Sequence, residues 1–402
     1  MYQFKQIDAI THDVFVKNHE LCNLLQSASW AKVKENWDHV FVGVFDDKTL
    51  VASSLVLIKQ LPLGFTMMYT PRGPILDYTD ERLVTYFFQE LRKFAKKKRC
   101  LFVKMDPAIH YQDFHLGEQP QVEANIDKIM KNAKKAGLIH QGFSKDMSST
   151  IQPRFQANVY QSEFDPETFS KSTKKMLATA AKKQVKVEKC GVEKVGEFSK
   201  LMDLTTERKQ IALRGESYFR KLLDVYKDDA FLMMASLDLE SIYAATKARY
   251  DKNIEDLANC PENAKKKRFT LEELDASLSR ECKELEHWLE VYGTHVYIAG
   301  TLVVMYGHTS EILYAGMNDE FKRYMAPYAT WYESMAMCFT HGAKTCNMGG
   351  IDGSLQDGLT KFKRNFNPMI NELIGEFDLP GNTLLYKLSH TMYEKRKHAL
   401  NG

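Results

Sequence analysis

Apolar runs and turn signals follow one another in a regular order over the first hundred residues. Residues 41–45 and 50–58 are two apolar runs separated by the polar triplet Asp-Asp-Lys, which is typical of a β-hairpin. A third run, 66–69, ends at a Thr-Pro-Arg-Gly-Pro breaker. Residues 80–98 then place apolar side chains at helical spacing, and the run 100–105 predicts a strand after this helix.

The same order returns in the second half of the chain. Residues 230–237 and 297–306 are the apolar runs of another hairpin, and 311–314 is the strand that follows. A helix is predicted over 327–340 and a strand over 345–348. Hairpin, strand, helix and strand is the order seen in acyltransferases of the GNAT fold. The pattern therefore predicts an α/β (α+β) protein with two GNAT-like acyltransferase units in tandem.

The repeat also suggests where the chain divides. A first GNAT-like unit is expected over 1–150, with the C-terminal residues 375–402 packing on it, and a second over 151–374. The chain has 402 residues, of which 44% are hydrophobic. This length is sufficient for two cores, because a single core stops growing at roughly 250–300 residues.

An insertion rich in Ala, Lys and Glu separates the two strands of the second hairpin. Over 241–292 its apolar residues recur at helical spacing, and the stretch 259–263 breaks the pattern. We expect an antiparallel two-helix coiled-coil arm that serves packing, dimerisation or, through its basic tip at 265–268, contact with tRNA. A second basic helix is expected over 171–189, whose lysines either face solvent or follow RNA phosphates.

Composition narrows the class of protein. The net charge of +3 is compatible with a polyanionic partner and does not require one. The seven cysteines form no Cys-x-x-Cys pair and no zinc-ligand spacing, so reduced thiols are expected and no metal site. No secretory signal is recognisable, and no segment approaches the roughly 18 apolar residues of a membrane span. We therefore expect a cytoplasmic protein.

Absent motifs argue against several enzyme classes. The chain has no G-x-x-x-x-G-K-[ST] of P-loop enzymes, no H-E-x-x-H of zincins and no G-x-S-x-G of α/β-hydrolases. It also lacks the Gly-rich [QR]-x-x-G-x-[GA] turn with which GNAT enzymes hold the coenzyme A pyrophosphate. The acyl donor is therefore expected to be something other than acyl-CoA, and no cofactor is predicted.

Several short segments resemble the FemABX family of peptidoglycan aminoacyltransferases. They occur in the family's order over nearly the whole chain, which makes the set specific although each segment alone is weak. The helical arm resembles the FemA, FemB and MurM/MurN branches, and residues 24–34 look most like streptococcal MurM/MurN. The matching segments are 26–27 with 30–34, 71–74 with 77–78, 314–316, 326–328, 349–353, 359–366 and 375–378.

The resemblance implies a donor, an acceptor and a product. The donor would be aminoacyl-tRNA carrying Ala or Ser, and the acceptor lipid II, with UDP-MurNAc-pentapeptide as the alternative. The product would carry the new residue on the stem-peptide lysine or on the first residue of the interpeptide bridge. The basic C-terminal segment 393–398 either is solvated or contacts anionic lipid at the inner face of the membrane.

Aminolysis of the aminoacyl ester needs a hydrogen-bond donor that stabilises the oxyanion and a group that accepts the proton lost by the attacking amine. Lys363 lies in the family's Phe-Lys signature, and we expect it to stabilise the oxyanion and the tRNA end; a surface lysine is the alternative. Asp106 ends the strand of the first unit. We expect it to accept a proton or to orient the attacking amine, unless it only caps the turn at Pro107.

The resemblance also assigns residues to substrate binding. Lys34, Arg214, Tyr218 and Tyr314 match positions that hold the diphosphate and sugar of the precursor, and Phe362 belongs to the same set although it also suits packing. Arg214 and Tyr218 are four residues apart, so a helical turn would place them on one face. Lys34 would otherwise be solvated, and Tyr314 would belong to the core.

Two other functions remain open at this point. The first is an acyl-CoA-dependent GNAT N-acyltransferase, against which the absent pyrophosphate turn argues. The second is a non-enzymatic RNA-binding or coiled-coil scaffold, which would leave the Phe362-Lys363 signature without a purpose.

Overall fold

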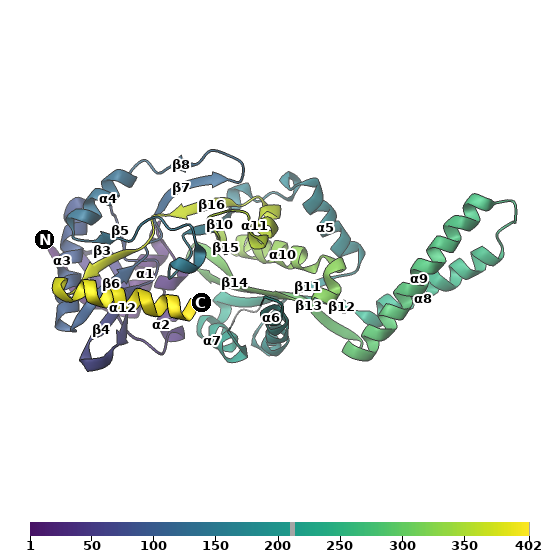
Figure 1. Cartoon of the computed structure of the whole chain (residues 1–402), viewed down its shortest axis with the longest axis horizontal. Helices are drawn as coiled ribbons and strands as arrows, with labels where there is room; N and C mark the ends of the chain where they lie inside the picture. Colours follow the sequence, from purple (N-terminus) through teal and green to yellow (C-terminus); the bar gives the residue numbers. More distant parts are fainter. Residues whose placement is uncertain (210–213, 402) are drawn as a thin grey trace.

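The computed structural model describes residues 1–209 and 214–401. Figure 1 shows two halves, each built on a sheet, and a pair of long helices that projects from the second half away from the first. Within the described residues, one sheet has eight strands and the other has nine. The arrangement agrees with the tandem α/β fold and the inserted arm that the sequence predicts.

The first sheet contains the predicted hairpin and the parallel pair that follows it. Strands β2 (Asp38–Asp46) and β3 (Thr49–Gln60) are antiparallel, whereas β4 (Thr66–Thr70) and β6 (Cys100–Met105) are parallel. The order across the sheet is β1-β2-β3-β4-β6-β17-β9, with β5 paired to β3. The remaining strands are β1 (Tyr2–Ile7), β5 (Ile75–Leu76), β9 (Ile139–His140) and β17 (Phe377–Pro380).

Helix α3 (Glu81–Lys97) connects β4 to β6. The Asp80 side chain accepts hydrogen bonds from two backbone N–H groups of the first turn, as an N-cap does. Leu83, Phe87 and Leu91 recur every four residues and are buried, so this face of the helix covers the sheet. The other helices of this half are α1 (Ala9–Asn18), α2 (Ala28–Val33) and α4 (Ile126–Lys135).

The second sheet repeats the order of the first. Its order is β11-β12-β13-β14-β15-β10-β16-β7-β8. β12 and β13 form the antiparallel hairpin, and β14 and β15 are parallel strands connected through α10 (Ala326–Thr340). The strands are β7 (His110–His115), β8 (Gln121–Val122), β10 (Phe155–Tyr160), β11 (Lys186–Cys190), β12 (Ala230–Asp238), β13 (His295–Tyr306), β14 (Thr309–Met317), β15 (Thr345–Ile351) and β16 (Met369–Leu373).

The pairing of strands crosses the division expected at residue 150. β7 and β8 lie within 1–150 but belong to the second sheet, where β7 pairs with β16. β17 follows β16 in the chain and returns to the first sheet, where it pairs with β6. The expected assignment of residues 110–122 to the first unit is therefore wrong, because an apolar pattern identifies a strand and not its partner.

The basic helix expected over 171–189 is shorter than predicted. Helix α5 spans Lys171–Lys182, and Lys186–Cys190 forms β11. Gln184 adopts a φ of +60°, and the N–H of Val185 bonds back to the carbonyl of Ala180, which ends the helix. The remaining helices of the body are α6 (Val195–Lys209), α7 (Glu216–Tyr226), α11 (Gly358–Lys363) and α12 (Thr383–Asn401).

The arm consists of α8 (Leu239–Ala258) and α9 (Lys265–Tyr292) and projects from the end of β12 (Figure 1). Tyr243 near its base donates to Glu286, and Asn253 farther out donates to the carbonyl of Leu271, so the helices are antiparallel. Leu278, Cys282 and Leu285 of the predicted apolar stripe are buried.

All seven cysteines of the chain are buried and none forms a disulfide. In the described part of the chain, no helix has the length and apolar character needed to cross a bilayer.

Candidate active site

A cavity of about 1120 Å³ opens between the first sheet, α2, α7 and α12. Lys34, Arg214 and Tyr218 all line it, so the structure brings together three of the four residues expected to hold the diphosphate and sugar. Tyr314, the fourth, is not in the wall. Its ring lies behind Tyr218, with the ring centroids 6.1 Å apart.

Three cationic side chains line this cavity, namely Lys34, Lys59 and Arg214. The ammonium of Lys34 lies 4.7 Å from the centroid of the Trp30 ring. Burial and the nearby charge of Arg214 lower the pKa of Lys34, which indicates that the two cations are close enough to repel each other. Such a pair suits an anionic ligand that would relieve the repulsion.

Arg214 does not lie on a helix as the four-residue spacing suggested. Helix α7 begins at Glu216, and Gly215 before it is extended, with φ −93° and ψ −180°. The guanidinium nevertheless lies 5.2 Å from the centroid of the Tyr218 ring. Cation–π contact therefore brings the pair together instead of helical periodicity.

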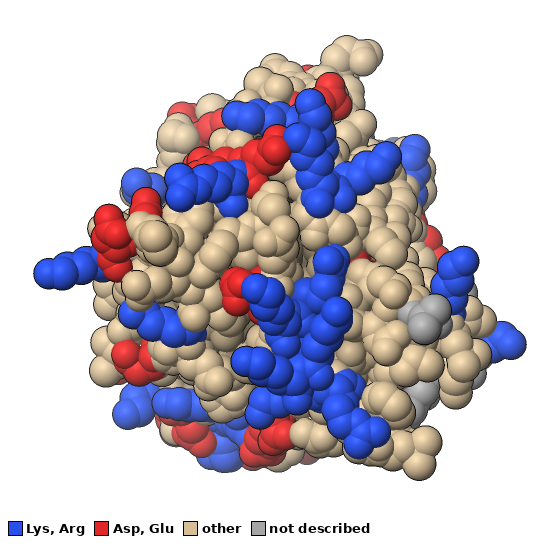
Figure 2. All heavy atoms as spheres, turned by 90° about the vertical axis from the view of Figure 1, so that its left-hand side faces the viewer, with Lys and Arg blue, Asp and Glu red and all other residues tan. Residues whose placement is uncertain are grey.

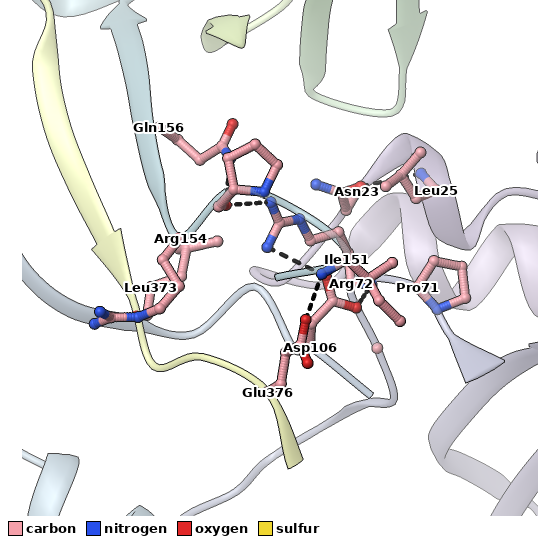
Figure 3. A network of polar contacts seen from close by, with 12 residues as sticks. Asn23, Leu25, Pro71, Arg72, Asp106, Ile151, Arg154, Gln156, Leu373 and Glu376 are labelled. Carbon is pink, nitrogen blue, oxygen red and sulfur yellow. Dashed lines mark hydrogen bonds and ion pairs between the residues drawn. The ribbon is translucent and has the colours of Figure 1, made fainter. Parts of the chain in front are cut away.

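Asp106 lies at the carboxyl end of β6 and faces Arg72, as Figure 3 shows. Its Oδ1 accepts hydrogen bonds of 3.0 Å from the Tyr69 hydroxyl and from the backbone N–H of Arg72. Its Oδ2 lies 3.4 Å from Nη1 of Arg72. Burial raises the pKa of Asp106 to about 6, although the Arg72 charge opposes this.

These contacts place Asp106 where it holds Arg72. The carboxylate is only 2% exposed, and Arg72 also donates through Nη2 to the carbonyl of Pro153 at 2.8 Å. Arg72 has a φ of +51°, which is uncommon for a residue with a side chain and indicates that its position is imposed by the surroundings. The Gln26 side chain supports the same loop by donating to the carbonyl of Pro71.

Lys363 is buried in the second half, 3% exposed, at the end of α11. Its ammonium donates 2.9 Å hydrogen bonds to the carbonyls of Gly349 and Gly350 on β15. β14 and β15 pair only up to Glu311 and Asn347, so the strands have separated where Lys363 approaches. The structure thus excludes a solvated surface lysine and places a charge beside the separated strands.

Phe362 lies in a cluster of aromatic rings. Its ring centroid is 5.1 Å from that of Tyr328, 5.4 Å from Trp331 and 5.9 Å from Phe366. This packing fixes the turn that positions Lys363. A direct contact of Phe362 with substrate stays a prediction.

A second, smaller cavity of about 210 Å³ is lined by Arg72, which belongs to one of the matching segments, and by Glu311, which sequence reasoning did not select. Burial raises the pKa of Glu311 to about 7, against the opposing charges of Arg72 and Lys363. A glutamate within the run 311–314 was the available signal, but the run was interpreted only as a strand. Asp106 accepts hydrogen bonds from Tyr69 and from Arg72. Tyr69 lines the larger cavity and Arg72 lines the smaller one.

Two GNAT-like units with a buried cation beside separated parallel strands define an acyltransferase of the tandem class. A tandem GNAT protein from the clavulanic acid biosynthesis pathway has the same fold, with a TM-score of 0.50, 8% identity, and 95% of this chain and 99% of that one covered. FemX superimposes with a TM-score of 0.77 and 26% identity, over 96% of this chain and 99% of FemX.

The FemAB family model matches residues 7–394, and the chain belongs to this family. The lipid II:glycine glycyltransferase of Staphylococcus haemolyticus is 28% identical, over 94% of this chain and 92% of that protein. Aminoacyltransferase FemA of Staphylococcus epidermidis is 26% identical, over 91% and 92%. The family and the fold class predicted from the motifs are confirmed, and the chain is an aminoacyltransferase.

Proposed function

We propose that this protein transfers a small amino acid from its tRNA to an amine of lipid II and so builds the interpeptide bridge of peptidoglycan. The observation that carries the proposal is the pairing of a large cationic cavity in the first half with a buried lysine at separated strands in the second. The name of one relative, lipid II:glycine glycyltransferase, supports lipid II as the acceptor and glycine as the transferred amino acid. The resemblance to MurM/MurN supports Ala or Ser.

The large cavity is suited to the acceptor. Lys34 and Arg214 offer two positive charges to a diphosphate, and the planar guanidinium can donate two hydrogen bonds to phosphate oxygens. Trp30 and Tyr218 provide flat apolar surfaces for a sugar ring. The volume of about 1120 Å³ is slightly above the roughly 300–1,000 Å³ of ordinary ligand sites, which fits a precursor of several linked groups.

The reaction is aminolysis of an ester. The free amine of the acceptor attacks the carbonyl carbon of the aminoacyl group, a C–N bond forms, and the bond from this carbon to the ribose oxygen breaks. The attacking nitrogen loses a proton and the ribose oxygen leaves protonated. Lys363 stabilises the oxyanion, and Asp106 acts through Arg72, which it holds in the wall of the smaller cavity. The ester is already activated, so the step needs no cofactor.

The mouth of the large cavity is suited to a lipid-linked acceptor. Leu63 is 85% exposed and Leu388 and Met392 are each 64% exposed, although all three line the cavity. Residues 96–99 are basic and exposed, and the Arg99 guanidinium is 4.9 Å from the ring of Phe65, which lines the cavity. Figure 2 shows Lys and Arg gathered on this end of the molecule. We place this rim on the cytoplasmic face of the membrane.

The test is transfer of labelled Gly, Ala and Ser from charged tRNA. The acceptors are lipid II, lipid II that already carries one added residue, and the UDP-linked precursor. We expect transfer to a lipid-linked acceptor, and the acceptor that takes the label identifies the position in the bridge. Folded protein that transfers no label to any acceptor refutes the proposal, and transfer from acetyl-CoA alone makes the chain an ordinary GNAT enzyme.

A further inference from the structure

The smaller cavity lies where the parallel strands of the second sheet begin to separate. β14 and β15 pair through three positions, from Thr309 with Thr345 to Glu311 with Asn347, and no further. Glu311 and Asn347 line the cavity at the last pair, and Asn347 accepts a hydrogen bond from the N–H of Gly349. The last pair therefore lies two residues before Gly349, the first of the two carbonyls that bind Lys363.

The lining is mostly polar and carries two carboxylates, Glu20 and Glu311. Its volume of about 210 Å³ is below the roughly 300–1,000 Å³ of sites for drug-sized ligands, so it suits a small group. Amides and hydroxyls of Gln156, Asn158, Tyr160 and Asn347 supply hydrogen-bond partners. Such a lining is unsuited to an apolar ligand.

The charges of this cavity are arranged so that Glu311 can receive a further cation. Arg72 is in the wall, but its own ion pair is with Asp106. Lys363 directs its ammonium at two main-chain carbonyls. Glu311 is half-buried and is the strand partner of Asn347, whose side-chain amide donates to Gln156. A carboxylate in such surroundings gains most from a partner that brings both charge and N–H donors.

We propose that the smaller cavity binds the aminoacyl group of the donor, with Glu311 accepting hydrogen bonds from its α-ammonium. This inference rests on the proposed function and adds the site that recognises the donor. The ester carbonyl is two bonds from the ammonium, so it would lie on the Asn347–Gly349 side, where Lys363 is held.

The test compares two esters of the same tRNA. One carries the amino acid that the wild-type protein transfers, and the other carries its 2-hydroxy analogue, in which a hydroxyl replaces the ammonium. The wild type should prefer the aminoacyl donor by about 10- to 100-fold in kcat/KM, which is the worth of a charge-assisted hydrogen bond. Glu311→Gln should reduce this preference to about threefold or less, whereas Glu311→Asp should keep most of it.

Glu320→Gln is the matched control, because it removes a carboxylate from an exposed position shortly after the same strand. It should keep the wild-type preference. The inference is wrong if Glu311→Gln slows both donors in equal proportion, which would indicate a role in chemistry or folding, or if the wild type does not distinguish the donors. Failure of the proposed function has a different result, since the wild type would then transfer from neither ester.

Discussion

Replacing Lys363 by Met removes the ammonium and keeps most of the side chain's length and apolar contact. The carbonyls of Gly349 and Gly350 then lose a donor at 2.9 Å inside the protein. A buried polar group without its partner costs about 1–3 kcal/mol, so the variant should lose roughly 2 kcal/mol of unfolding free energy. Because domains of this kind have about 5–15 kcal/mol, it should remain folded.

The effect on transfer should be larger than the effect on stability. Loss of one oxyanion donor lowers the rate by about 10²–10³-fold, or about 3–4 kcal/mol of transition-state stabilisation. Single-turnover transfer to lipid II with pre-bound charged tRNA measures this step, and urea unfolding of the same sample measures stability. Binding of both substrates should change little in comparison.

Lys361→Met is the matched control for this experiment. Lys361 lies two residues earlier on α11 and is exposed, so its loss should change stability by less than about 0.5 kcal/mol and leave transfer unchanged. If folded Lys363→Met transfers within about threefold of the wild type, Lys363 does not stabilise the oxyanion. Equal losses in both variants would instead indicate a general effect of positive charge on tRNA binding.

Three further outcomes follow from the same structure. Folding raises the pKa of Asp106 to about 6, so between pH 4 and 6 the folded state holds a proton that the unfolded state has lost. Asp106 should therefore lower wild-type stability by up to about 3 kcal/mol as pH rises through this range, and in urea titrations the loss of stability should be smaller by this amount in Asp106→Asn. Arg214→Ala should raise KM for lipid II about tenfold with a smaller change in kcat, and equal KM values in steady-state assays would remove Arg214 from the acceptor site. Leu63→Asp should weaken flotation with anionic vesicles and leave transfer to the UDP-linked precursor intact; unchanged flotation would show that the cavity rim does not contact lipid.

Local patterns predicted the elements that depend on neighbours in the chain. The apolar spacing after Asp80 and its capping role gave α3 within one residue at each end, and the run 100–105 is β6 itself. Both hairpins and the arm were predicted for the same reason, since periodicity and breakers are local signals. Lys363 was selected through its motif, and its burial against β15 could not be read from the chain.

Features that depend on contacts between distant residues could not be predicted from local sequence patterns. β7 joins the second sheet because it pairs with β16, which lies more than two hundred residues later in the chain. Burial raises the pKa of Glu311, and the charges of Arg72 and Lys363, which come from two other parts of the chain, oppose this rise. Arg214 meets Tyr218 through ring contact, although the helix that was expected to align them begins after it. None of these contacts leaves a periodic trace in the sequence.

The crossed strands give the tandem architecture a mechanical role. If each half were a separate body on a linker, the distance between the proposed acceptor cavity and Lys363 would vary with the linker. Here β7 and β8 are built into the second sheet and β17 into the first, so main-chain hydrogen bonds fix both halves to each other. Asp106, which directly precedes this crossing, is thereby held where it can join Tyr69 of one cavity to Arg72 of the other. Aminolysis gains most from such fixed placement, because the ester is already reactive and the amine needs mainly to be positioned against it.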